Sequence, residues 1–139
     1  MYQNGIQQAL NEYRTSGAAE AGGGADPHRL VQMLFQGALE QVAISRGAME
    51  QGNVAEKGQR IGRALEIIEV LQMHLDMERG GEVASNLEAL YDYMQRRLAE
   101  ANLRNDLAAL DEVSNLLREI KAGWDAIPTP APQTREMVG

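Results

Sequence analysis

The sequence contains no cysteine, which excludes disulfides, zinc–thiolate sites and thiol catalysis and favours a reducing compartment. Aromatic residues make up only 4% of the chain, so there are few platforms on which nucleic acid bases could stack. Cations are also in the minority, with 13 basic against 20 acidic side chains and a net charge of -7. An acidic chain with scattered cations is a poor match to a phosphate backbone, and we expect no nucleic acid partner.

Long apolar segments are missing as well. No apolar run approaches the roughly 18 residues that a membrane-spanning helix needs. The amino-terminal residues lack the basic start and the continuous apolar stretch of a secretory signal. We therefore expect a cytoplasmic protein without a membrane span. A length of 139 residues fits one domain with a core of its own.

The apolar residues that are present recur at the three- and four-residue spacing of amphipathic helices, and no segment alternates with the period of a strand. With the capping residues between segments, this spacing predicts helices over about residues 26–52, 54–79, 82–103 and 107–127. The second helix is expected to end at a left-handed cap formed by Gly80 and Gly81. Helices of this length joined by short turns predict an all-α, antiparallel up-and-down four-helix bundle.

The residues on either side of the bundle are expected to be less ordered. Residues 1–25 predict a flexible arm with a short amphipathic helical stretch, followed by a Gly- and Ala-rich linker. The prolines at 128, 130 and 132 prevent the last helix from continuing, so 128–139 is expected to be a disordered tail. The predicted parts of the chain are therefore 1–25, 26–127 and 128–139.

The predicted helices carry more apolar residues than one core-facing stripe requires. On the third helix a narrow stripe from Val83 to Ala101 accounts for them. On the first two helices, apolar residues also fall outside the core stripe when residues are placed at about 100° steps, namely Met33, Leu39, Ile44, Ile67, Val70 and Met77. They either contact the arm, the tail or a second subunit or are singly exposed, or they form a groove for an amphipathic or extended segment of another protein. The pattern leaves both interpretations open.

The sequence offers little for catalysis or metal binding. A di-metal site in a bundle needs paired Glu-x-x-His motifs, but Ala25 and Leu71 stand three residues before the two histidines, His28 and His74. Two histidines on helices also provide no Ser/His/Asp arrangement, and the sequence shows no orienting partner for His28. We expect no enzymatic activity, no metal and no cofactor, and we expect Trp124 to fill the core.

Three longer strings are more specific than periodicity. They cover Asp26 to Ala38 (DPHRLVQMLFQGA), Leu75 to Leu87 (LDMERGGEVASNL) and Leu90 to Asp106 (LYDYMQRRLAEANLRND), and Glu112-Val113 and Trp124 follow them. In their order and spacing these strings resemble the flagellar secretion chaperone family FliS over about residues 26–127, with a weaker echo at Tyr13. The chain is identified as a member of that family by this resemblance.

The resemblance implies a function. Members of this family bind the disordered carboxy-terminal segment of flagellin in the cytoplasm, prevent its premature polymerisation and deliver it to the flagellar export gate. A groove that accepts an apolar segment without folding it suits this task, because the ordering entropy that the client loses moderates affinity and permits release. The resemblance thus implies flagellin and an export gate component as partners.

The resemblance also implies that the amino-terminal arm is a lid over part of the groove, and Ile6 and Tyr13 would be its anchors in this sequence. The six apolar residues outside the core stripes are the candidate client surface by helical phase alone. An alternative is a helical adaptor whose surplus apolar surface is a homodimer interface, stable with or without client. A homodimer of the client-free chaperone is also compatible with this surface.

Overall fold

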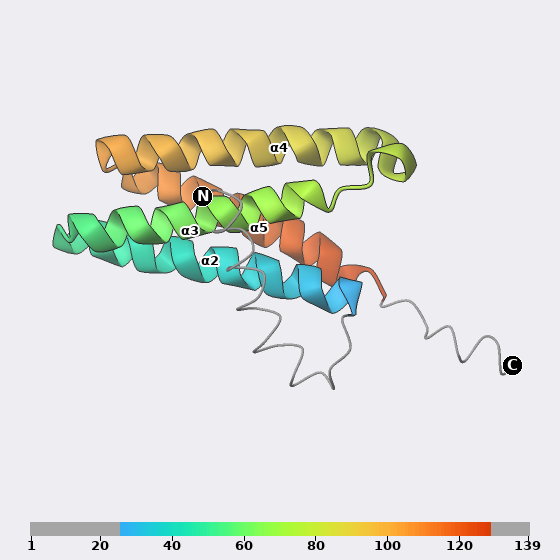
Figure 1. Cartoon of the computed structure of the whole chain (residues 1–139), viewed down its shortest axis with the longest axis horizontal. Helices are drawn as coiled ribbons and strands as arrows, with labels where there is room; N and C mark the ends of the chain where they lie inside the picture. Colours follow the sequence, from blue (N-terminus) through green and yellow to red (C-terminus); the bar gives the residue numbers. More distant parts are fainter. Residues whose placement is uncertain (1–25, 129–139) are drawn as a thin grey trace, which may run out of the picture.

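The computed structural model describes residues 26–128, so the predicted arm at 1–25 and the tail beyond Pro128 lie outside the described residues. Its helices are α2 (Pro27–Gln51), α3 (Val54–Met73), α4 (Met77–Arg104) and α5 (Leu107–Ala126). Successive helices run in opposite directions and pack against each other, and α5 returns to pack against α2 (Figure 1). The predicted all-α, antiparallel four-helix bundle is confirmed.

Each of these helices begins at an acidic or amide side chain that accepts a hydrogen bond from a backbone N–H two or three residues later. The four capping residues are Asp26, Asn53, Asp76 and Asp106. Gly52 and Asn105 take left-handed backbone conformations, with φ of 74° and 55°, and end α2 and α4. The capping side chains and these two left-handed residues explain why the chain turns where it does.

The second predicted helix ends earlier than expected, because α3 stops at Met73 and α4 begins at Met77. Asp76 caps a new helical turn by accepting from the backbone N–H of Arg79, so the apolar periodicity continues across a real break. Gly81 does not end a helix. It kinks α4 just after its first turn, with φ 53° and ψ -125°, a conformation open to glycine alone.

The core lies along the centre of the bundle, and α3 contributes half of its circumference to it. Ile67 and Val70 are 0% and 2% exposed, so the prediction that they point away from the core is wrong. Ala64, which is fully buried, lies between their arc and that of Ile61 and Ile68 at about 100° per residue. Since α3 packs against both α2 and α4, the two arcs form one continuous buried face.

A buried lysine closes the end of the bundle that holds the α2–α3 and α4–α5 turns. The ammonium of Lys57 on α3 donates to the backbone oxygen of Asn102 at 2.9 Å and to the side-chain oxygen of Asn105 at 2.7 Å. It thereby satisfies oxygen atoms at the carboxy-terminal end of α4, which have no partner within that helix. This contact ties α3 to the α4–α5 turn.

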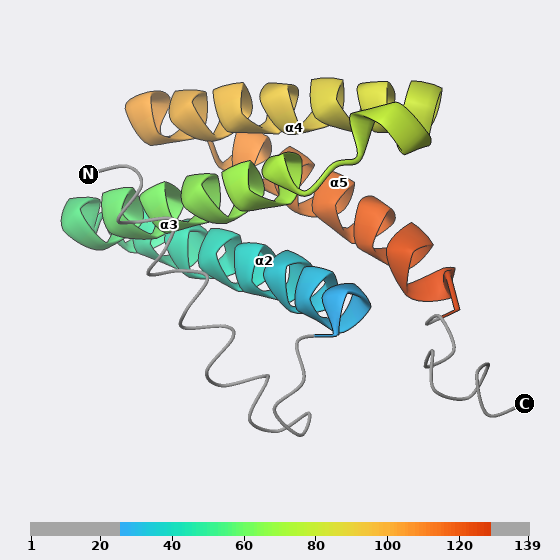
Figure 2. The same ribbon diagram turned by 45° about the vertical axis from the view of Figure 1, so that its right-hand side comes forward.

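At the opposite end of the bundle α5 runs away from α4 and toward α2, as both views of the ribbon show (Figures 1 and 2). We call this the open end; it is formed by the start of α2, the end of α3, the start of α4 and the end of α5. None of the helices in residues 26–128 is both long and apolar enough to cross a membrane.

Candidate binding groove

A groove with a cavity of about 340 Å³ lies at the open end. Its α4 wall is formed by Val83, Leu87 and Tyr91, and its α5 wall by Glu119, Ile120, Gly123 and Trp124, followed by Ile127. The remaining lining comes from Val31 and Phe35 of α2 and from Leu71, His74 and Leu75 at the end of α3. Only His74 and Glu119 interrupt a lining that is otherwise apolar, aromatic or glycine. We call this site the α4–α5 groove.

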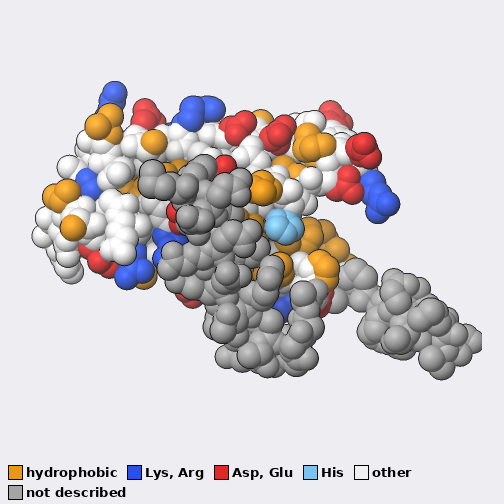
Figure 3. All heavy atoms as spheres, in the orientation of Figure 1, with side chains coloured by type: hydrophobic (Ala, Val, Ile, Leu, Met, Phe, Trp, Pro, Cys, Tyr) orange, Lys and Arg blue, Asp and Glu red, His pale blue; other side chains and the backbone are white. Residues whose placement is uncertain are grey.

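The groove faces solvent. Val83 and Ile127 are 67% and 50% exposed, and Figure 3 shows hydrophobic side chains on the surface where α3 and α5 end. Deeper in the groove, Phe35 and Leu71 belong to the buried core. The groove is therefore the open edge of the core itself, and exposed apolar surface of this kind is typical of a site for another chain.

Nearer the α4–α5 turn and outside the groove lining, Glu112 of α5 is bonded to α4. Its carboxylate accepts from Nε of Arg97 at 2.7 Å and from the hydroxyl of Tyr93 at 2.8 Å, both on α4. The hydrogen bond from Arg97, and then that from Tyr93, hold the pKa of Glu112 below its ordinary value. The same bond to Glu112 raises the pKa of the Tyr93 hydroxyl. These contacts keep α4 and α5 together at this level.

Near the end of α5 the groove is bounded by Trp124, which is hydrogen-bonded to the start of α2. The indole N–H donates to the backbone oxygen of His28 at 3.0 Å, and Nε2 of His28 lies 3.1 Å from the backbone oxygen of Trp124. The two rings stack, with centroids 4.9 Å apart and planes at 16°. The expectation that His28 lacks an orienting partner is therefore wrong, and Trp124 is a wall of the groove as well as a neighbour of the core.

Besides Glu119 and the indole of Trp124, the hydroxyl of Tyr91 and the imidazole of His74 are the polar groups among the residues that line the groove. Tyr91 is buried, burial raises its pKa to about 12, and its hydroxyl therefore stays protonated. His74 is exposed, and its Nδ1 lies 2.9 Å from the backbone oxygen of Val70. Both could exchange hydrogen bonds with the backbone of a bound segment. No group of three or more His, Cys, Asp or Glu able to hold a metal occurs in residues 26–128.

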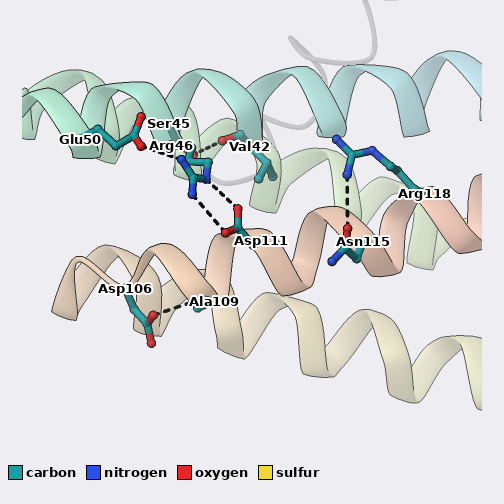
Figure 4. A network of polar contacts seen from close by, with 9 residues as sticks. All are labelled: Val42, Ser45, Arg46, Glu50, Asp106, Ala109, Asp111, Asn115 and Arg118. Carbon is teal, nitrogen blue, oxygen red and sulfur yellow. Dashed lines mark hydrogen bonds and ion pairs between the residues drawn. The ribbon is translucent and has the colours of Figure 1, made fainter.

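A second hollow lies on the face between α2 and α5, and its polar side chains are held by hydrogen bonds and ion pairs. Arg46 of α2 donates from Nε to Asp111 of α5 at 2.7 Å and from Nη1 to Glu50 at 2.7 Å, while Arg118 donates to Asn115 at 3.3 Å. Figure 4 shows how these side chains lie along the two helices. The bonds to Arg46 hold the pKa of Asp111 low. Because most of its charges are already paired, this face serves to join α2 to α5.

The structure separates the six residues that helical phase selected. Ile67 and Val70 lie in the core, Ile44 and Met77 are exposed, and Met33 and Leu39 are half-buried. None of the six lines the α4–α5 groove. The proposed lid anchors, Ile6 and Tyr13, lie outside the described residues.

The sequence pattern does not predict this groove, because helical phase selects apolar residues outside the core stripes. Its walls are the core stripes of α4 and α5 themselves, which become exposed where these helices separate. Val83, predicted to be core, is the clearest case. A weak signal was available, because Gly80-Gly81 and Pro128 mark irregular backbone beside both walls.

Comparison with known proteins gives one consistent result. The family model described as "Flagellar protein FliS" matches residues 8–131. A flagellar secretion chaperone FliSB of Pseudomonas aeruginosa is 52% identical over 120 residues, which are 86% of this chain and 95% of the relative. The flagellar secretion chaperones FliS of Vibrio cholerae and Salmonella typhimurium are 44% and 48% identical, over 88% and 77% of this chain and 90% and 80% of theirs.

Proposed function

This chain belongs to the flagellar protein FliS family, a family of flagellar secretion chaperones, and we propose that it binds the carboxy-terminal segment of flagellin in the cytoplasm. There it prevents premature polymerisation and delivers the segment to a component of the flagellar export gate. Chaperones are not an enzyme class, and the proposed mechanism requires binding alone.

The observation that carries this proposal is the solvent-facing α4–α5 groove. Its cavity of about 340 Å³ accommodates a few apolar side chains of a segment rather than a globular domain. Apolar side chains on one face of a client helix would replace water over Val83, Leu87 and Ile120. Each square ångström of apolar surface removed from water contributes about 25 cal/mol, and the client's ordering entropy offsets part of this gain.

A titration tests this placement. The full chain is titrated with a synthetic flagellin carboxy-terminal segment while amide shifts are recorded. The fluorescence of Trp124, the sole tryptophan in the sequence, is followed in parallel. We expect saturable shifts at Val83 and Ile120 and a change in emission. Shifts confined to Ile44 and Met33 would place the client on the α2 surface instead, and the absence of binding would refute the proposal.

The alternative is a helical adaptor in which a second copy of the chain covers the exposed apolar surface. A homodimer would be stable whether or not client is added, whereas a client-free dimer of the chaperone dissociates when the flagellin segment binds. Sedimentation with and without the segment separates the two proposals.

The amino-terminal arm is proposed to be a lid that competes with the client, with Ile6 and Tyr13 as its anchors. Removing residues 1–15 should then change client affinity and leave the thermal unfolding midpoint nearly unchanged. A large loss of thermal stability would instead make the arm a structural part of the bundle.

A further inference from the structure

The end of α5 is fastened to α2 and not to α4. His28 and Trp124 contact each other three times, by two hydrogen bonds of 3.1 and 3.0 Å and by ring stacking. One turn along α2, the side-chain amide of Gln32 donates to Asp125 at 2.8 Å. Asp26 caps the first turn of α2 by accepting from the backbone N–H of His28.

On the α4 side the last polar contact is at Glu112. Within residues 26–128, no hydrogen bond or ion pair joins α4 to any residue of α5 beyond Glu112. From there to Ile127 the two helices diverge (Figure 2), and the facing side chains are apolar except for Glu119 and the hydroxyl of Tyr91.

If the two exposed apolar walls closed on each other, the free energy would fall by about 25 cal/mol for each square ångström buried. Val83 on α4 nevertheless remains 67% exposed. The contact between His28 and Trp124 at the start of α2 is in a position to oppose such closure.

We infer that His28 is a positioning residue for the α4–α5 groove. Its imidazole holds Trp124 and the end of α5 against α2, and this keeps the groove open in the free protein. Since the ring is stacked and bonded to the backbone at once, loss of the imidazole removes two of the three contacts with Trp124 and lets the end of α5 move toward α4. As far as client affinity is concerned, the inference rests on the proposed function.

Distance measurements test this in the full chain. The sequence has no cysteine, so spin labels can be attached at Asn86→Cys on α4 and Ala122→Cys on α5, both exposed positions. Pulsed electron paramagnetic resonance gives the distribution of distances between the two labels. Without client, we expect His28→Ala to shorten the mean distance and broaden the distribution. His28→Gln keeps a donor near the position of Nε2 and should restore part of the original distribution.

Two further variants separate positioning from stability. Trp124→Phe keeps a ring in the groove wall but loses the indole N–H, and should shift the distance in the same direction by less. Lys57→Met destabilises the bundle from the opposite end and should leave the distance unchanged. If His28→Ala lowers the unfolding midpoint as Lys57→Met does and the distance stays at its original value, His28 is merely structural and the inference is overturned.

Client binding supplies a second readout. We expect His28→Ala to weaken binding of the flagellin segment about tenfold, with His28→Gln in between. Equal affinity for the original chain and His28→Ala would overturn the role of this pair in client binding. If the original chain itself does not bind the segment, the proposed function fails, while the client-free distances still decide whether His28 keeps the groove open.

Discussion

At the scale of single residues, Val83 provides the most direct test of the groove, because it lies in the α4 wall and is 67% exposed. We expect Val83→Glu to weaken client binding at least tenfold, since a carboxylate in a desolvated groove is costly. The free energy of unfolding should change by only about 0.5 kcal/mol, as for most surface substitutions.

The matched control for Val83 is Leu103, on the same helix, 80% exposed and outside the groove. Leu103→Glu should leave the affinity unchanged when both variants are compared by calorimetric titration. Equal losses in the two variants would show that added negative charge on α4 repels the client in general, and the groove would lose its support.

Val70 is the residue whose role the structure changes most. Because it is 2% exposed, Val70→Glu should destabilise the fold by about 3–5 kcal/mol through an unpaired buried charge. Ile44, with 41% of its surface exposed, is its control, and Ile44→Glu should cost about 1 kcal/mol or less. Urea unfolding measures both, and similar stabilities for the two variants would contradict the packing of α3 described above.

At the scale of elements, three of the four helix starts in residues 26–128 were predictable, and the break between α3 and α4 was not. Asp26, Asn53 and Asp106 combine a capping side chain with the beginning of an apolar period, so sequence and structure agree there. Asp76 also caps a helix, but the apolar spacing runs on through Leu75 and Met77 and hides the break. A three-residue turn leaves almost no trace in a pattern with a period of 3.6.

Gly81 is the element-scale feature most open to test. Its backbone, with φ 53° and ψ -125°, is strained for any residue with a Cβ, so Gly81→Ala should destabilise the protein by about 1–3 kcal/mol. Gly47 lies inside α2 with nothing near its missing Cβ, and Gly47→Ala should stabilise by about 0.5–1 kcal/mol. Urea unfolding should therefore show a lower free energy of unfolding for Gly81→Ala and a higher one for Gly47→Ala. A gain in stability for both would mean that the α4 kink is not maintained in solution.

At the scale of the whole molecule, the number, direction and class of the helices followed from spacing and turn length, but the angle between α4 and α5 did not. That angle depends on which side chains bond across the bundle, such as His28 with Trp124, which are 96 positions apart. Nothing in the local sequence pairs residues so distant. The family resemblance could therefore indicate the function, while the position of the groove required the packed structure.

The charges that join the helices predict how stability depends on pH. Glu112 and Asp111 each pair with an arginine of another helix, while Asp125 pairs with Lys121 of its own helix and accepts from Gln32 of α2. The pKa of Glu112 lies below the ordinary 4.5, and those of Asp111 and Asp125 lie below the ordinary 3.8. A depressed pKa means that the unfolded chain takes up protons first as the pH falls. The stabilisation is therefore complete above about pH 4.5, the ordinary glutamate value, and is lost as the pH falls through 4.5 and below. Thermal unfolding midpoints between pH 7 and 3 should follow this course.

A single variant separates this effect from general acid unfolding. Glu112→Gln removes the carboxylate that Arg97 and Tyr93 share, so its midpoint should fall less steeply below pH 4.5 than that of the original chain. Salt at about 1 M shortens the screening length to about 3 Å. Because these groups lie at the surface, it should reduce the difference between the unfolding midpoints of Glu112→Gln and the original chain. If both proteins lose stability in parallel at low and high salt, the link between α4 and α5 at Glu112 is not electrostatic, and apolar packing beside Glu112 must hold these helices together.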